Sequence, residues 1–146
     1  MRNVREVLAG FWGGFYNRSA LLPAPTPIPA FQNGYVFFRD AQGRPLPEPV
    51  YPYITYEIAL PAMSDFVILT ANIYDRNANN PGFMGLVDDV LDQATERVPE
   101  SGLMLDVGNR GMLVLRRSTP FIDYLDDPDQ FISRGIIRYA VEGYLY

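Results

Sequence analysis

The segments 53-YITYEIAL-60 and 66-FVILTANIYD-75 decide the predicted fold. Apolar and polar side chains alternate along both segments, as they do in a strand that buries one face. Only five residues, 61-PAMSD-65, separate them, and this stretch contains a proline, a serine and an aspartate that favour a turn. A connection this short joins strands that run in opposite directions. The sequence therefore predicts an antiparallel strand pair.

A helix is predicted after the second strand, from Pro81 to Val98. Asn80 followed by Pro81 is typical of a helix start, because asparagine caps free backbone N–H groups and proline fits the first helical position. Pro99 ends the helix. The expected buried face consists of Phe83, Val87, Val90, Leu91, Ala94 and Val98. The opposite face carries Asp88, Asp92 and Glu96, for which a solvated surface is the first interpretation and cation binding the alternative.

The rest of the chain extends this pattern in both directions. Segments 103–107 and 112–117 flank 108-GNRG-111, a typical hairpin turn, and residues 132–146 have the pattern of a long aromatic strand. Residues 120–125 fit no single pattern. At the other end, apolar residues at helical spacing predict a helix over 2–16. Prolines 23, 25, 27 and 29 then predict an extended connector, followed by a short strand over 35–39.

These elements define an α+β chain, in which an antiparallel (mixed) β-sheet packs against two α-helices, with a β-hairpin and a proline-rich connector. The length of 146 residues fits a single domain, 1–146. Within it we expect an N-terminal helix (1–16), the connector (17–34) and an α+β core (35–146).

Three absent residue types limit the chemistry of the chain. It contains no His, no Cys and no Lys, so all 12 basic residues are Arg. Imidazole bases, thiolate nucleophiles, thiolate metal sites and Schiff-base lysines are therefore excluded. We expect no enzymatic activity, no catalytic residue, no cofactor and no metal site. The net charge of −5 argues against a basic nucleic-acid surface, and no apolar run approaches the roughly 20 residues of a membrane span.

Four aspartates, Asp123, Asp126, Asp127 and Asp129, lie close together before the last predicted strand. A cluster of this kind can bind calcium, but Pro128 interrupts the four aspartates and the glycine of a calcium-binding loop is missing. A polar turn is the preferred interpretation.

Arg116 and Arg117 are candidate subunit-contact residues at the end of a predicted strand. Neighbouring strand residues point to opposite faces, and arginine pairs well with carboxylates across interfaces. The other candidate interface residues are Asp88, Asp92, Asp126, Asp127 and Tyr144, the tyrosine being one of ten in the chain. Asp40, Arg44, Asn109 and Arg110 belong to two candidate contact loops.

Several segments together resemble the tail terminator (tail completion) proteins of long-tailed bacteriophages. The first are 52-PYITYEI-58 and 68-ILTANIYDR-76, followed by the amphipathic helix. The later ones are 113-LVLRRSTPFID-123 and 134-RGIIRY-139, and the similarity covers roughly residues 30–146. The resemblance implies an α+β subunit that forms a hexameric ring. It also implies a structural virion protein, made in the host cytoplasm, that caps the tail tube at its head-proximal end.

The partners implied by this resemblance are other copies of the chain, the tail tube protein and the head-neck connector protein. DNA would pass through the ring without specific binding, and no membrane is involved. Two alternatives stay open: a head-tail connector or head-completion (stopper or adaptor) ring protein, and a small carboxylate-dependent hydrolase.

Overall fold

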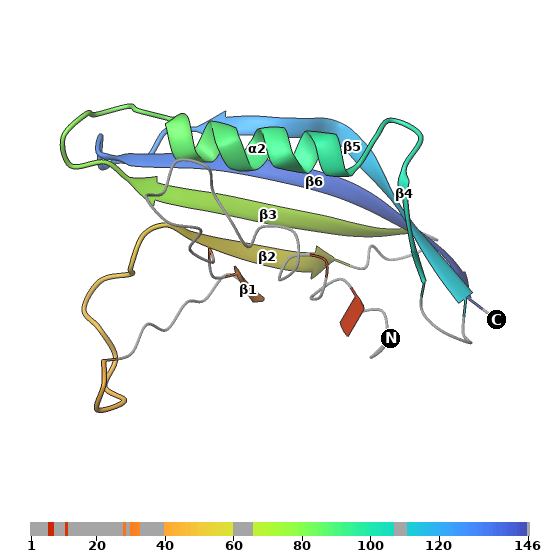
Figure 1. Ribbon diagram of the computed structural model, residues 1–146, viewed down its shortest axis with the longest axis horizontal. Coiled ribbons are helices and arrows are strands. Elements are labelled where there is room, and N and C mark those ends of the chain that lie inside the picture. Colours follow the sequence, from red (N-terminus) through yellow and green to blue (C-terminus); the bar gives the residue numbers. More distant parts are fainter. Residues whose placement is uncertain are drawn as a thin grey trace.

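The computed structural model describes residues 6–7, 11, 28, 30–32, 40–59, 66–106 and 111–145. About half of these residues lie in strands, which form a curled sheet with the order β1-β2-β3-β6-β5-β4 (Figure 1). The strands are β1 (Ala30–Gln32), β2 (Tyr53–Ala59), β3 (Phe66–Arg76), β4 (Leu103–Asp106), β5 (Gly111–Leu125) and β6 (Ile132–Leu145). Helix α2 (Gly85–Arg97) connects β3 to β4.

Antiparallel pairing joins the five strands β2 to β6. The longest uninterrupted register runs between β3 and β6, from Phe66↔Glu142 to Arg76↔Ile132. Strand β5 follows β6 along most of its length, with a shift in register between Arg117 and Ile122. Strand β1 adds a short parallel edge beside β2. Long neighbouring strands with a common twist give the sheet its curl.

Helix α2 packs across one face of the sheet and builds the core there (Figure 1). At Gly135 of β6 the helix comes so close that a Cβ atom would lie 2.8 Å from Cγ1 of Val87. The Tyr139 hydroxyl donates a hydrogen bond to the carbonyl oxygen of Ala94 at 3.2 Å. The fully buried side chains include Ile54, Leu69, Ile73, Leu91, Leu115, Ile137 and Tyr139. We call the opposite side of the sheet the outer face.

The predicted fold class is wrong, because the chain is mostly β and its sheet does not pack against two helices. The one helix whose bounds fall within the described residues is α2. Residues 120–125, which fitted no pattern, continue β5 to a length of 15 residues, and β1 forms inside the expected connector. The chain therefore contains more strand than its sequence predicts. Of the predicted helix 2–16, only residues 6, 7 and 11 are described, and these three are helical.

The predicted strands over 53–60, 66–75, 103–107 and 132–146 are confirmed within one or two residues, and so is the antiparallel pairing of the first two. The expected strand 35–39, most of the connector 17–34 and the hairpin turn at 107–110 lie outside the described residues.

Helix α2 begins at Gly85, four residues later than predicted. The Asn77 side chain accepts hydrogen bonds from the backbone N–H groups of Asn79 and Asn80 and so stabilises a turn before the helix. Gly82 adopts a φ of 74°, and its N–H donates to the carbonyl oxygen of Gln130. Phe83 therefore precedes the helix and is 43% exposed, contrary to the predicted buried face. The other five predicted residues of that face are buried.

Candidate assembly surface

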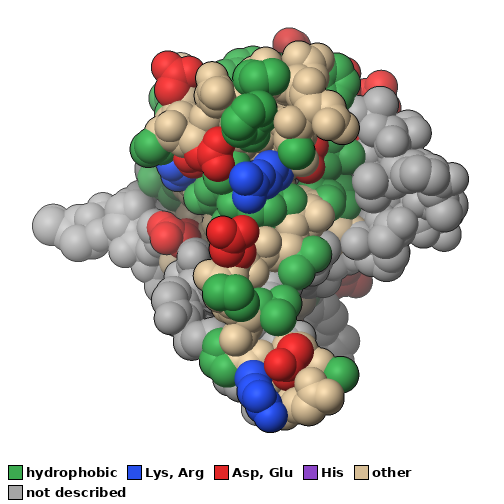
Figure 2. Space-filling view, turned by 90° about the vertical axis from the view of Figure 1, so that its left-hand side faces the viewer, with side chains coloured by type: hydrophobic (Ala, Val, Ile, Leu, Met, Phe, Trp, Pro, Cys, Tyr) green, Lys and Arg blue, Asp and Glu red, His purple; other side chains and the backbone are tan. Residues whose placement is uncertain are grey.

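Residues 40–50 form a protrusion that we call the arm. It extends away from the sheet before β2 and is the projection at the bottom of Figure 2 (Figures 1 and 2). At its tip, the Asp40 carboxylate accepts hydrogen bonds from the backbone N–H groups of Gln42 and Arg44, both at 2.9 Å. Gly43 closes the turn with a φ of 78°, a conformation that favours glycine. The arm therefore has a defined tip, built from its own backbone and one carboxylate.

The stem of the arm keeps apolar side chains in solvent. Leu46 is 36% exposed and Val50 is 53% exposed. Prolines occupy positions 45, 47 and 49, and each fixes its own φ and disfavours a helical conformation of the residue before it. An extended, proline-stiffened segment loses less conformational freedom on docking than a flexible loop does. The stem is thus suited to contact with another surface.

Ion pairs attach the base of the arm to the sheet. Arg76, the last residue of β3, lies 3.7 Å from the Glu48 carboxylate and 3.8 Å from that of Asp129 in the β5–β6 loop. These groups are exposed, so the pairs contribute little stability individually. They do bring together three segments that are far apart in the sequence at the base of the arm.

A cluster of tyrosines continues from the arm onto the outer face. The rings of Tyr51 and Tyr53 lie 5.3 Å apart, and Tyr53 stacks on Tyr74 at 4.7 Å. The Arg134 guanidinium lies 5.2 Å from the centre of the Tyr74 ring and donates to the Asn72 side chain at 2.9 Å. Burial is the main cause that raises the pKa of Tyr53 to about 12, and the neighbouring Tyr51 and Tyr74 add to it. The tyrosine cluster therefore serves as a packing and hydrogen-bonding group.

Further along the outer face, arginines are matched by carboxylates. Arg138 forms an ion pair with Asp123, and Nε of Arg116 lies 3.3 Å from the Glu142 carboxylate. Both of these arginines have a carboxylate partner within the sheet, so the pairs do not form a basic strip that would attract a polyanion.

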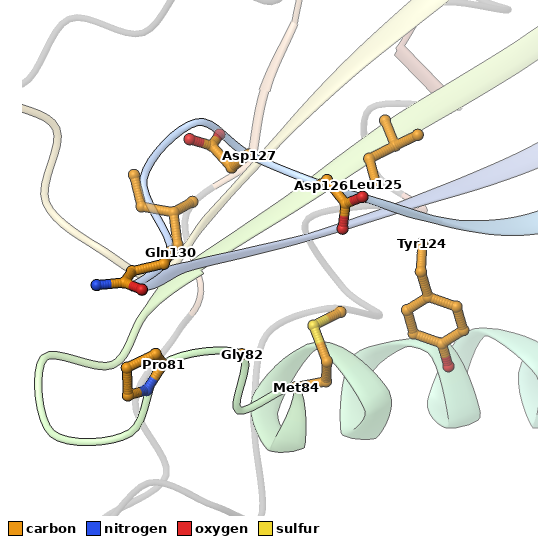
Figure 3. A pocket seen from close by; sticks show the side chains of 9 residues that line it. Pro81, Gly82, Met84, Tyr124, Leu125, Asp126, Asp127 and Gln130 are labelled. Atoms are coloured by element: carbon orange, nitrogen blue, oxygen red, sulfur yellow. The ribbon is translucent and has the colours of Figure 1, made fainter.

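A groove of about 550 Å³ opens beside the N-terminal end of α2 (Figure 3). Met84, at the start of the helix, and Tyr124, near the end of β5, both line it (Figure 3). The lining consists of Pro81, Gly82, Met84, Tyr124, Leu125, Asp126, Asp127, Gln130 and Ile132. The groove thus combines an apolar lining with carboxylates from the β5–β6 loop.

The aspartates of the β5–β6 loop form a polar turn. Asp127 accepts a hydrogen bond from the Asp129 N–H, and Asp129 accepts one from the Phe131 N–H, both at 3.0 Å. Asp126 is exposed. In the part of the chain that the structure describes, no group of three or more acidic side chains is arranged to hold a metal ion.

The structure gives both candidate interface arginines partners within the chain. Besides its ion pair with Glu142, Arg116 donates to the Ser101 carbonyl oxygen at 3.5 Å. Arg117 points to the other face and donates to the carbonyl oxygens of Thr95 and Val98 at the end of α2. Their proposed contact with a neighbouring subunit stays a prediction.

The remaining predicted residues are distributed over several surfaces. Asp88 and Asp92 are exposed on α2, and the Asp88 carboxylate accepts a hydrogen bond from the Tyr124 hydroxyl at 2.8 Å. This hydrogen bond is the main cause that raises the pKa of Tyr124. Asn109, Arg110 and the Tyr144 side chain lie outside the described residues. The structure therefore brings together Asp126 and Asp127 at the groove, and Asp40 and Arg44 at the arm tip.

Sequence reasoning missed the stem of the arm and the groove. The alternating prolines 45, 47 and 49 were the available signal for a stiff, exposed segment with apolar residues between them. The groove had no such signal, because it forms where the end of β5, its following loop and the start of α2 meet in space.

No protein-family model matches the chain, and no curated protein sequence matches it. Among the described residues, none of the helical structure is both long and apolar enough to cross a bilayer.

Proposed function

We propose that this protein is a structural virion component, a tail terminator whose copies form a ring that caps the phage tail tube and joins it to the head-neck connector. The observation that carries the assembly part of this proposal is the arm. The stem of the arm presents apolar surface to water at Leu46 and Val50. Contact with another subunit would bury it.

The phage-tail part of the proposal rests on the sequence resemblance. Its segments fall on β2, β3, β5 and β6, which are four neighbouring strands at the centre of the sheet. The similarity therefore concerns one continuous part of the fold. The described residues are mostly β, whereas the resemblance implies an α+β subunit, so the resemblance supports the assignment through these strands and helix α2.

Charge is compatible with a channel for DNA. The net charge of −5 and the paired arginines of the outer face leave no strong attraction for phosphates. Duplex DNA would pass such a ring without being held. In this proposal, Arg116, Arg117, Asp88, Asp92 and Tyr144 remain candidate contact residues between subunits.

Imaging of assembled tails tests the proposal. Electron microscopy of tails that carry a labelled copy of this chain should show density at the head-proximal end of the tube. The mass of the assembly formed with tail tube protein should match a closed ring, with six copies expected from the resemblance. Density on the connector with none on the tube would favour the head-tail connector alternative instead. Density along the tube, at the tail tip or in the capsid shell would reject both, as would a metal-dependent hydrolase activity lost on replacing one aspartate.

A further inference from the structure

The groove beside the start of α2 offers apolar surface to another molecule. Met84, Leu125 and Ile132 line it, together with Tyr124, which is 57% exposed (Figure 3). The volume of about 550 Å³ lies within the range of roughly 300–1,000 Å³ that is typical of ligand pockets. Apolar side chains around a hollow of this size can bury the aliphatic part of a ligand.

The charge at the groove is negative. Its described lining residues include two aspartates, Asp126 and Asp127, and no arginine. Asp126 is exposed and forms no ion pair with the described residues. Asp88 brings a third carboxylate beside the groove, because it accepts the hydrogen bond from the Tyr124 hydroxyl at 2.8 Å. This hydrogen bond is the main cause that raises the pKa of Tyr124, and the nearby charge of Asp92 adds to it.

The neighbouring arginine at the base of the arm does not reverse this charge. Arg76 lies between two carboxylates, at 3.7 Å from that of Glu48 and 3.8 Å from that of Asp129. One positive charge therefore faces two negative charges there. The stem of the arm and the β5–β6 loop thus extend the acidic surroundings of the groove.

This combination favours a cationic occupant with an aliphatic part. Arginine and lysine side chains carry their charge at the end of an apolar stem, so one side chain can satisfy both features. The face of an exposed aromatic ring such as that of Tyr124 also attracts a cation. Nucleic acid is disfavoured, because the same carboxylates repel phosphate groups.

We propose that the groove binds a basic, aliphatic segment of a partner protein. An arginine or lysine of this segment lies beside Asp126 and Asp127, and its aliphatic side chains pack against Met84, Tyr124 and Leu125. The inference goes beyond the proposed function, since it concerns one binding site on a single copy of the chain and requires neither a ring nor a phage tail.

Selection from a library of random short peptides, displayed on yeast cells, tests the chemistry of the occupant without presupposing its sequence. The full chain is the bait, and a variant with Asp126→Asn and Asp127→Asn serves to discard peptides that bind elsewhere. Asparagine keeps an oxygen that can accept the hydrogen bond from the Asp129 N–H, so the β5–β6 loop should stay intact. We expect the enriched peptides to combine arginine or lysine with aliphatic residues.

Fluorescence anisotropy then measures the dissociation constant of an enriched peptide. The variant with both asparagines should bind it about tenfold more weakly, because two partly exposed ion pairs are lost. The matched control combines Glu57→Gln with Glu100→Gln, which removes the same number of charges from exposed positions that do not line the groove. Its affinity should stay within about twofold, since salt screens distant charges. Circular dichroism verifies that each variant is folded.

Three results would overturn the inference. The first is enrichment of acidic or uncharged peptides, or of none that distinguishes the wild type from the asparagine variant. The second is equal weakening in the two charge variants, because the attraction is then general. The third is self-association of the wild-type chain in sedimentation velocity that the asparagine variant lacks, because the occupant is then a second copy.

These outcomes are separate from those of the proposed function. Failure of groove binding, with density at the head-proximal end of the tail tube, would reject this inference and leave the terminator proposal standing. Groove binding with density elsewhere in the virion would support the site and reject the terminator assignment.

Discussion

Arg117 on β5 secures the end of helix α2, because its Nε donates a hydrogen bond to the carbonyl oxygen of Val98 at 2.8 Å. Its Nη2 donates to the Thr95 carbonyl oxygen at 2.9 Å. The last carbonyl groups of a helix have no partners within the helix, and a positive charge there also interacts favourably with the helix dipole. The arginine predicted as an interface residue therefore has a structural role inside the subunit.

Arg117→Ala should lower the free energy of unfolding by about 2 kcal/mol, because it removes two hydrogen bonds from a charged donor and the favourable charge at the helix end. Arg116→Ala is the matched control. Its ion pair is exposed, so the loss should stay below about 1 kcal/mol. Urea denaturation followed by circular dichroism measures both. Equal losses for the two variants would contradict the role assigned to Arg117.

Gly135→Ala should destabilise the protein by about 1–3 kcal/mol, since the new methyl group would overlap Val87 and lie 3.2 Å from Cδ1 of Leu91. Thermal and chemical denaturation measure the effect. Gly143→Ala, at an exposed position of the same strand, serves as the control and should change stability little. Wild-type stability of Gly135→Ala would show that α2 packs less closely on β6.

Asp75→Asn tests a partly buried carboxylate. Burial raises the pKa of Asp75 above its ordinary value of 3.8, against a smaller opposite effect of a backbone hydrogen bond. The folded state thus binds this proton more tightly, and stability decreases as the pH rises from 3.8 through the raised pKa. Asp75→Asn should therefore gain more stability relative to the wild type at pH 7 than at pH 3. A pH-independent effect of Asp75→Asn would refute this.

Tyr53→Phe tests the tyrosine cluster at alkaline pH. The pKa of Tyr53 is raised from 10.0 to about 12, so the unfolded chain loses this proton first and stability falls as the pH rises between these values. Removal of the hydroxyl should make the decrease less steep. Denaturation series from pH 8 to pH 11 give the two slopes, and the same slope for both proteins would place Tyr53 in solvent.

Much of the sheet could be predicted because its strands are regular. In β2, apolar Ile54 and Ile58 alternate with Thr55 and Glu57, and this pattern predicts a strand with one face in the core, although Thr55 on the other face is buried as well. The end of α2 could also be predicted from neighbouring residues, since Pro99 cannot continue a helix. The start of α2 could not, because Asn77 and Gln130 stabilise a turn at positions where Asn80 and Pro81 favour a helix.

The candidate site was less predictable than the sheet. Asp40 and Arg44 were identified from the composition of a loop, but Leu46 and Val50 were not, because isolated apolar residues in a sequence do not reveal whether they are covered. For Arg117, the pattern indicated a strand end and an exposed charge. Its partners at the end of α2 are 19 and 22 residues away, and only the folded chain brings them together.

The sequence by itself determined the residue types available for chemistry, the alternation of β2, β3 and β6, and the acidic balance. These properties depend on composition and on neighbours along the chain, so they are fixed before folding. The tertiary structure decided the mostly β fold class, the parallel addition of β1, the direction of the arm and the groove beside α2. Each of these depends on contacts between segments that are distant in the sequence, where packing and the pairing of backbone groups outweigh local preference.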